Sequence, residues 1–262
     1  MTAIHDAARQ GYSNEAKSYE SGRPEYPGEL QSWLSDALAI GAGTTVLDLG
    51  AGTGKFSQRL VRTGAAVVAV EPVAAMRERL AAKLPTVTAL PGTAERMPVE
   101  TGSADVVICA QAFHWFATDA ALQEIHRVLR PGGQLGLVWN VRDESVDWVA
   151  AITEIITPYE GDAPRFYKGD WRRPFGEASF GRRGFSPLQS NVFVHHHLGG
   201  PELVIIDRFL SVSFIAALPD AEKARVKAQL QTLIDTHPAL RGRDSVAFPY
   251  RTEAYRCARL DI

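Results

Sequence analysis

The sequence predicts an α/β fold with a doubly wound sheet of seven strands and helices on both of its faces. Short continuous apolar segments, typical of strands buried on both sides, alternate with segments whose apolar residues recur at helical spacing. Because crossovers between parallel strands are right-handed, this alternation winds helices onto both faces of the sheet. After residue 145 the alternation gives way to a mainly helical stretch, which predicts a helical insertion near the C-terminal end.

Strands and helices alternate regularly in the first part of the chain. Strands are expected at residues 45–49, 66–70, 86–90, 105–110 and 134–139, and helices at residues 28–40, 55–62, 74–83 and 118–129. Thr118 is expected to cap the last of these helices, since a threonine hydroxyl accepts a hydrogen bond from an unpaired backbone N–H. The run Arg130-Pro131-Gly132-Gly133 is expected to end that helix as a turn.

The second part of the chain mixes the two patterns. We expect a helix at residues 147–159, a loop at 161–185, a strand at 188–198, helices at 203–217 and 221–236, and a last strand at 246–260. The helices of this part form the insertion, which is expected to cover the substrate. The whole chain, residues 1–262, is expected to form one domain.

The composition of the chain indicates which kind of partner and which cellular compartment to expect. The chain has 262 residues, of which 45% are hydrophobic and 22% charged, and its formal net charge is −2. Since this balance does not favour nucleic acid or an anionic membrane surface, we expect a small-molecule substrate, with neither nucleic acid nor membrane as partner. No apolar leader opens the sequence, and Cys109 and Cys257 are interpreted as buried thiols. A cytoplasmic protein, monomeric or homodimeric, is expected.

The stretch from Val46 to Phe56, VLDLGAGTGKF, is the strongest local signal, because an apolar strand leads directly into closely spaced glycines. Three nucleotide chemistries begin in a similar way. A phosphate-binding loop requires a magnesium-binding hydroxyl at the position of Phe56. A dinucleotide-binding turn requires a third glycine where Lys55 stands, so an NAD(P)-dependent oxidoreductase is the weaker alternative.

The third chemistry fits the spacing. Asp48-Leu49-Gly50-Ala51-Gly52-Thr53-Gly54 resembles the first motif, D-x-G-x-G-x-G, of the class I S-adenosylmethionine (SAM)-dependent methyltransferases. Segments that resemble further family motifs follow in the family's order, at residues 70–72, 92–98, 105–116 and 128–133. The resemblance implies a Rossmann-like fold, SAM as the cofactor and S-adenosylhomocysteine as the product, with residues 41–145 as the SAM-binding core.

The resemblance also implies three parts of a cofactor site. The glycine turn lets the backbone approach the amino-acid portion of SAM, an acid after the second strand accepts the ribose hydroxyls, and two later segments contact the adenine. The residues concerned are, in that order, Gly50, Ala51, Gly52 and Gly54; Glu71 and Pro72; and Met76, Thr93, Ala94 and Glu95, with Gln111 as a contact to the cofactor's amino group or to the acceptor. Thr93 departs from the family pattern, which has an acid there, and Glu95 is expected to take over its contact.

Two flanking segments narrow the resemblance. YESGRPEYP at residues 19–27 and QAFHWF at residues 111–116 resemble segments of small-molecule methyltransferases similar to the trans-aconitate methyltransferase group. The resemblance implies that residues 1–40 form a lid and a helix, and that Tyr19 and Arg23 close over the cofactor. Arg23 would pair with the cofactor's carboxylate, because a guanidinium matches a carboxylate with two parallel hydrogen bonds.

His114 and Trp115 are the candidate catalytic residues, because they follow the fourth strand at the edge where open α/β sheets bind ligands. His114 would act as a general base or would only position the acceptor, and Trp115 would donate its indole N–H to an acceptor oxygen or serve as a packing anchor. Methyl transfer from a sulfonium is an in-line displacement of a good leaving group, so alignment and exclusion of water matter most. We expect an oxygen acceptor, either a carboxylate or a hydroxyl.

Two further segments are rich in basic residues or histidines. Residues 165–183 carry arginines among aromatic side chains, and one or two of these arginines would bind an acidic substrate group if the segment covers the site. His195-His196-His197 is not expected to bind metal, because alternate residues of a strand face opposite sides and further ligands are not near in sequence. A SAM-binding module without catalysis and a macromolecular methyltransferase are the remaining alternatives.

Overall fold

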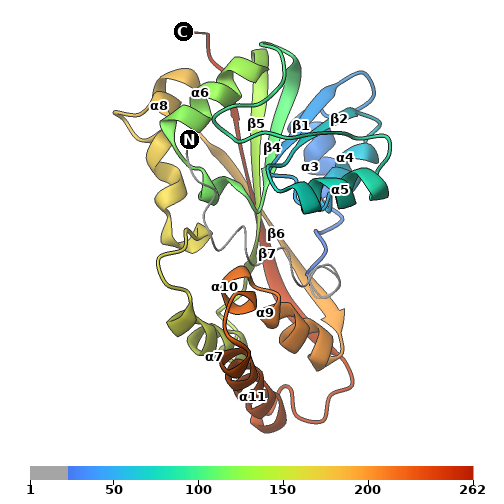
Figure 1. Ribbon diagram of the computed structural model, residues 1–262, viewed down its shortest axis with the longest axis vertical. Coiled ribbons are helices and arrows are strands. Elements are labelled where there is room, and N and C mark those ends of the chain that lie inside the picture. The colour runs from blue at the N-terminus through green and yellow to red at the C-terminus, as the bar shows by residue number, and fades with distance from the viewer. Residues whose placement is uncertain (1–22, 262) are drawn as a thin grey trace. The chain divides into compact units, whose positions relative to one another are not determined.

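The computed structural model of the protein describes residues 23–261 (Figure 1). Within these residues the strands form one seven-stranded sheet in the order β3-β2-β1-β4-β5-β7-β6, which confirms the predicted α/β fold. The strands are β1 (Thr45–Leu49), β2 (Ala66–Val70), β3 (Thr88–Leu90), β4 (Ala104–Ala110), β5 (Leu129–Arg142), β6 (Gln189–Gly199) and β7 (Val246–Ala258).

The described chain divides into two compact units. We call one of them the core unit; it consists of Pro27–Trp139, Pro164–Phe193 and the described residues from Glu253 onward. We call the other the accessory unit; it consists of residues 23–26, Asn140–Ala163 and Val194–Thr252. The single domain expected for residues 1–262 stays a prediction.

The core unit carries the parallel part of the sheet. β1 pairs in parallel with both β2 and β4, β2 pairs with β3, and β4 pairs with β5. In Figure 1, α3 (Leu30–Asp36), α4 (Ser57–Val61) and α5 (Ala74–Lys83) lie on one side of these strands. α6 (Asp119–Val128) and α8 (Phe180–Gly184) lie on the other side. Because the strands are covered on both faces, their side chains are apolar on both faces, as the sequence predicts.

Local signals predict several of these elements closely. The bounds of β1, β2 and α5 agree with the expected ranges. Thr118 caps α6 as predicted, since its side-chain oxygen accepts a hydrogen bond from the Ala121 N–H at 3.1 Å. Leu122 and Ile125 of this helix are fully buried, which accounts for the helical spacing of its apolar residues.

Two predictions for the core unit are wrong. α6 ends at Val128, as the run at residues 130–133 predicts, but these residues form no separate turn, because β5 begins at Leu129. Residues 161–185 are not a loop, since they include the 3-10 helices η3 (Phe166–Lys168) and η4 (Asp170–Phe175) as well as α8. These helices bury Trp171 and Phe180, so tertiary packing orders a segment that has no hydrophobic period of its own. A further 3-10 helix, η1 (Phe113–Trp115), follows β4.

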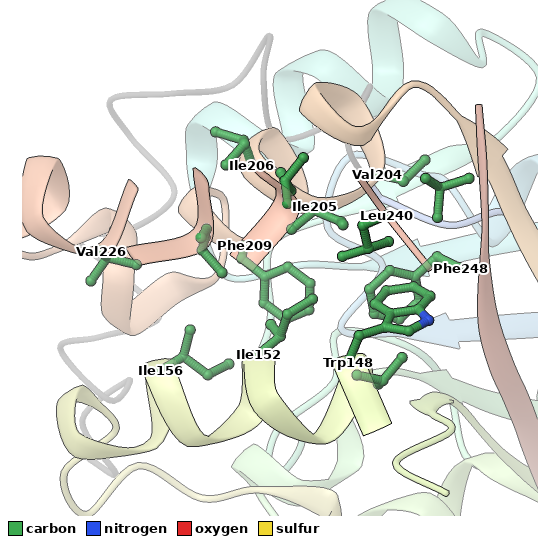
Figure 2. Close-up of a cluster of buried hydrophobic side chains, with 14 of the residues drawn as sticks. Trp148, Ile152, Ile156, Val204, Ile205, Ile206, Phe209, Val226, Leu240 and Phe248 are labelled. Atoms are coloured by element: carbon green, nitrogen blue, oxygen red, sulfur yellow. The ribbon is translucent and has the colours of Figure 1, made fainter. Parts of the chain in front are cut away.

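The accessory unit has a hydrophobic core of its own (Figure 2). Ile152 and Ile156 of α7 (Asp147–Ile156), which the 3-10 turn η2 (Thr157–Tyr159) follows, are buried in a cluster that also includes Phe209 and Phe248. α11 (Asp220–Thr236) contributes Val226, Leu230 and Ile234 to the same cluster. A separate core is what a compact folding unit requires.

The helix expected at residues 203–217 is interrupted. In its place lie a π-helical segment, η5 (Glu202–Asp207), and two short helices, α9 (Arg208–Leu210) and α10 (Ser213–Ala216). The hydroxyl of Ser211 donates to the carbonyl oxygen of Arg208 at 2.8 Å, and such local bonds compete with continuation of a helix. The helices of residues 23–261 are all too short or too polar to span a bilayer.

Candidate active site

The glycine turn after β1 has two crowded positions and one open one. Gly50, Gly52 and Gly54 have φ angles of +72°, +59° and +83°, a region that favours glycine. A Cβ on Gly50 would lie 2.8 Å from Ala112 Cβ, and one on Gly54 would lie 2.9 Å from Leu80 Cγ. A Cβ on Gly52 would meet nothing closer than the sulfur of Met76 at 4.0 Å. Packing therefore requires glycine at the two outer positions, and the middle one leaves an open face.

Glu71 links this turn to the start of α5. Its Oε2 accepts the Gly52 N–H at 2.9 Å, and its Oε1 accepts the Val73 N–H at 2.9 Å. Burial raises the pKa of Glu71, and the two backbone hydrogen bonds and Arg77 act in the opposite direction. Each carboxylate oxygen has a second lone pair, so Glu71 can still accept hydroxyl groups. Met76 is buried within the same turn region.

Asp48 is a buried carboxyl beneath the turn. Its Oδ2 accepts the Ser57 hydroxyl at 2.6 Å, and its buried Oδ1 has no hydrogen-bond partner in the described part of the chain. Burial raises the pKa of Asp48 to about 7, with Ser57 lowering it and the charge of Glu71 raising it. The sequence does not single out Ser57. The available signal was a small polar residue at the first position of the helix that follows the glycine turn.

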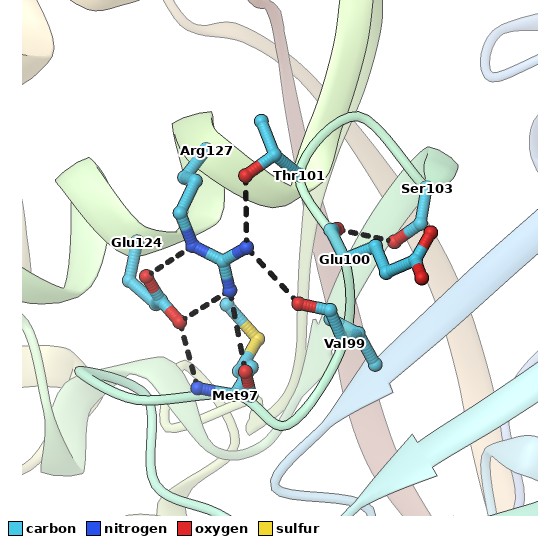
Figure 3. Close-up of polar contacts among 7 residues, drawn as sticks. All are labelled: Met97, Val99, Glu100, Thr101, Ser103, Glu124 and Arg127. Carbon is cyan, nitrogen blue, oxygen red and sulfur yellow. Dashed lines mark hydrogen bonds and ion pairs between the residues drawn. The ribbon is translucent and has the colours of Figure 1, made fainter.

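The segment after β3 is fixed to α6 through an arginine (Figure 3). The guanidinium of Arg127 binds both carboxylate oxygens of Glu124, at 2.8 and 2.7 Å, and also donates to the carbonyl oxygens of Met97 and Val99. Glu124 in turn accepts the Met97 N–H at 2.7 Å. These bonds anchor the end of the segment that includes Ala94, which is itself buried. This pair was not predicted, although an acid and an arginine three residues apart on a helix are a recognisable signal.

The short loop formed by this segment is closed by its own backbone. Thr93 and Arg96 exchange two hydrogen bonds, at 3.3 and 3.2 Å. A Cβ on Gly92 would lie 2.7 Å from Pro98, so the loop folds tightly onto itself. Glu95 is half-buried at its tip. The structure therefore places Thr93, Ala94 and Glu95 on one ordered loop after β3, as a shared role in one subsite requires.

The backbone is strained at the end of β4. Gln111 has φ +59°, in the left-handed region that residues other than glycine rarely adopt, and its N–H donates to Val138 O at 2.8 Å. Such a conformation costs roughly 1–2 kcal/mol and persists where the surrounding structure enforces it. This residue lies at the carboxyl end of a central strand, the place where open α/β sheets bind ligands.

His114 is held as a neutral imidazole. The indole N–H of Trp139 donates to its Nδ1 at 3.0 Å. Because an indole only donates, Nδ1 carries no proton and the neutral ring carries its proton on Nε2. Burial and, after it, the charge of Arg165 lower the pKa of His114 to about 3. At neutral pH the ring therefore has a donor at Nε2.

An aromatic cluster surrounds this pair. The ring of Trp139 lies 4.7 Å from that of Phe166 and 4.8 Å from that of Trp171. Arg165 lies over the ring of Trp115, with its guanidinium carbon 5.4 Å from the ring centroid. Both Phe166 and Arg165 come from the segment for which a loop was expected, so this segment brings aromatic and basic groups to His114 and Trp115.

The other basic residues of that segment have separate contacts. Arg172 stacks on Trp171 at 4.2 Å and donates to the hydroxyl of Tyr255 at 2.9 Å. That hydroxyl donates to Glu253 at 2.5 Å, and burial and Glu253 raise the pKa of Tyr255 to about 12. Arg173 pairs with Asp170 at 2.8 Å on the surface. Of these arginines, Arg165 is the one that lies beside the candidate catalytic residues.

The cofactor contacts expected for Tyr19 and Arg23 stay predictions. Tyr19 lies outside the described residues. Arg23 belongs to the accessory unit, so its contact with the cofactor stays a prediction. His195 uses Nε2 to bind the carbonyl oxygen of Glu25 at 3.0 Å. Within residues 23–261, no group of three or more His, Cys, Asp or Glu side chains is arranged to hold a metal ion.

Comparisons with known proteins agree with this geometry. The model of the methyltransferase domain family matches residues 47–137. A methyltransferase-like protein of Schizosaccharomyces pombe is 37% identical over 245 residues, which is 93% of each chain.

Two solved structures support the fold. The structure of a protein assigned as a type II methyltransferase from Anaeromyxobacter dehalogenans is similar with a TM-score of 0.64 and 24% identity, covering 90% of this chain and 96% of that one. A phosphoethanolamine N-methyltransferase of Haemonchus contortus, in complex with S-adenosylhomocysteine, has a TM-score of 0.58 and 14% identity, over all of this chain and 61% of its own. At these identities the two structures support the fold alone. The fission-yeast relative, the matched domain and the seven-stranded sheet together show that the chain belongs to the class I SAM-dependent methyltransferases.

Proposed function

We propose that this protein transfers the methyl group of SAM to an oxygen of a small molecule, and that the accepting oxygen belongs to a carboxylate. The observation that carries the proposal is the state of His114, a neutral ring with a pKa of about 3 beside the positive charge of Arg165. This pair suits an acceptor that is already anionic. An alcohol or a phenol would first have to lose a proton.

The residues around the glycine turn fit SAM. The open face over Gly52 leaves room for a ligand to approach the backbone, and the second lone pairs of the Glu71 carboxylate suit two ribose hydroxyls. The buried sulfur of Met76 gives an apolar surface beside the turn. When bound, SAM supplies a methyl group on a sulfonium, whose departure leaves a neutral thioether. The complex of the Haemonchus contortus enzyme with S-adenosylhomocysteine is consistent with the same ligand here.

His114 positions the acceptor. His114, whose conjugate acid has a pKa of about 3, is too weak a base to take the proton from a phenol, whose pKa is about 10. With Nδ1 committed to the Trp139 N–H, His114 can donate from Nε2 to one oxygen of a carboxylate. Arg165 adds a favourable charge, and the indole N–H of Trp115 is a second candidate donor. The residues then align one carboxylate oxygen for in-line attack and exclude water.

The chemical stability of the product tests this proposal. The protein is incubated with methyl-labelled SAM and a panel of small carboxylic acids, each paired with its primary amide and its primary alcohol. A carboxyl methyl ester releases its label as methanol in mild alkali, whereas an ether, an N-methyl or a C-methyl group does not. We expect labelling of acids alone, with a label that alkali releases. An alkali-stable label, or equal labelling of the alcohols, would contradict the carboxylate acceptor.

A further inference from the structure

The accessory unit buries a guanidinium group that has too few partners. The Nε and Nη1 atoms of Arg208 are inaccessible to solvent and have no hydrogen-bond partner within the described residues. The hydroxyl of Tyr250 is likewise buried, and it lies close enough to Arg208 to raise the pKa of that side chain, in part as a hydrogen-bond partner. A buried charged donor without an acceptor is strongly unfavourable, so this arrangement needs an explanation.

Like charges surround Arg208. Burial lowers its pKa, and the positive charges of Arg23 and Arg142 lower it further, while Tyr250 acts in the opposite direction. No carboxylate is among the groups of residues 23–261 that act on Arg208. Arginine nevertheless stays protonated at neutral pH, so this part of the accessory unit concentrates positive charge.

The cationic groups share an aromatic support. The guanidinium carbon of Arg142 lies 5.4 Å from the centroid of the Phe209 ring, and that of Arg208 lies 5.5 Å from the same centroid. Arg142 also pairs with Glu144 at 3.4 Å, but the Glu144 side chain is 47% exposed and the hydroxyl of Thr153 donates to the same oxygen. The Glu144 charge is therefore partly screened and shared.

Side-chain hydrogen bonds hold the backbone near the cluster. Arg208 directly follows the π-helical segment η5, a geometry that occurs often at functional sites. Its carbonyl oxygen accepts the Ser211 hydroxyl. Close to Arg23 in sequence, the carbonyl oxygen of Glu25 accepts hydrogen bonds from Asn140 Nδ2 at 3.2 Å and from His195 Nε2 at 3.0 Å. The accessory unit thus anchors the segments that carry Arg23 and Arg208.

We propose that Arg208, Arg142 and Tyr250 form a binding site for the anionic oxygen group of a small molecule, a carboxylate or a phosphate. The planar guanidinium fork matches the paired oxygens of both groups, and the Tyr250 hydroxyl is a further donor. The ligand supplies the acceptors that Arg208 Nε and Nη1 lack. This site is a property of the accessory unit and does not depend on SAM or on methyl transfer.

Calorimetric titration of the full-length protein, in low-salt chloride buffer and without SAM, tests the site. The probes are succinate, citrate and inorganic phosphate, which separate a carboxylate ligand from a phosphate ligand. We expect saturable binding of at least one probe. Arg208→Met should weaken it about tenfold or more, since charge-assisted hydrogen bonds are lost. Arg225→Met removes an exposed arginine of α11 from the same unit and is the matched control, for which no change is expected.

A second measurement keeps the test decisive if a variant folds poorly. The midpoint temperature of thermal unfolding of the wild type should rise as the probe that binds is added, because a ligand that binds the folded state stabilises it. Tyr250→Phe retains the ring and should weaken binding about threefold to tenfold, the share of one neutral hydrogen bond. Absence of binding by all three probes to the wild type would overturn the proposal, as would equal weakening in Arg208→Met and Arg225→Met. Anion binding without any methyl transfer would leave this site standing and would reject the proposed function alone.

Discussion

The core unit and the accessory unit build their candidate sites in opposite ways. In the core unit the backbone forms much of the site, through the turn at Gly50, Gly52 and Gly54 and the strained residue Gln111. In the accessory unit side chains form it, from residues as far apart in sequence as Arg142 and Tyr250. A site formed by the backbone requires particular residue types at fixed local spacing. A site formed by distant side chains leaves no such pattern.

The glycine turn offers the sharpest test of this contrast. Gly50 and Gly52 both have a positive φ, which is unfavourable for alanine. Gly50→Ala would in addition place a Cβ 2.8 Å from that of Ala112, whereas Gly52→Ala would make no close contact. We expect Gly50→Ala to lower the free energy of unfolding by about 3 kcal/mol, and Gly52→Ala by about 1 kcal/mol. Urea denaturation monitored by tryptophan fluorescence measures both. Equal losses would mean that packing against Ala112 does not distinguish the two positions.

Asp48 tests how burial shapes the same turn. Its folded pKa of about 7 lies above the value of about 4 that an unfolded aspartate has, so the folded state holds the proton more tightly. Stability from this group is therefore present at low pH and is lost as pH rises from about 4 to about 7. Asp48→Asn removes the titration and keeps an oxygen for Ser57.

As the pH rises from 5 to 8, the free energy of unfolding of Asp48→Asn should rise by about 2–3 kcal/mol relative to that of the wild type. The measurement is the difference between the two free energies of unfolding at each pH. A difference that stays constant over this range would contradict a raised pKa at Asp48.

His114 tests whether a side chain in the core unit performs acid–base chemistry. If it only positions the acceptor through Nε2–H, His114→Gln, which keeps an N–H donor, should retain kcat/KM to within about tenfold. His114→Phe, which has no donor, should lose more. Removal of a general base would cost about 10²–10⁴-fold in either variant. Since the pKa of His114 is about 3, we expect no inflection from this residue in the kcat/KM profile between pH 5 and pH 8.

A smaller effect is expected at the tether between α6 and the segment after β3. Glu124→Gln weakens the paired hydrogen bonds to Arg127, which holds the carbonyl oxygens of Met97 and Val99. The pair is partly exposed, so stability should fall by about 1 kcal/mol or less. The affinity for S-adenosylhomocysteine should fall about twofold to fivefold, because the tether only positions the segment that is expected to contact the cofactor. Unchanged affinity would separate this tether from the cofactor site.

Local patterns predict the core unit well because each of its signals acts over a few residues. The continuous apolar strands β1 and β2, the helix α5 and the Thr118 cap depend on neighbouring residues alone. The glycine turn is equally local. The family resemblance then orders these pieces and names the positions of the cofactor site.

The rest depends on contacts that spacing does not encode. The bond from Trp139 of β5 to His114, which lies in η1 after β4, decides which nitrogen of His114 carries the proton. The short helices of residues 164–185 form because Trp171 and Phe180 are buried by tertiary packing. The surroundings of Arg208 combine segments from both ends of the chain, so neither its burial nor its missing partners are visible in the sequence.

Calorimetric binding of S-adenosylhomocysteine and of NAD to the wild type, Glu71→Gln and Glu78→Gln tests whether the glycine turn and Glu71 form a SAM site. Glu78 is an exposed acid of α5 and serves as the matched control. We expect micromolar binding of S-adenosylhomocysteine to the wild type and to Glu78→Gln, and no binding of NAD. In Glu71→Gln the affinity for S-adenosylhomocysteine should be about tenfold weaker or more. A folded wild type that binds NAD in preference, or that binds S-adenosylhomocysteine equally well without the Glu71 carboxylate, would contradict this expectation.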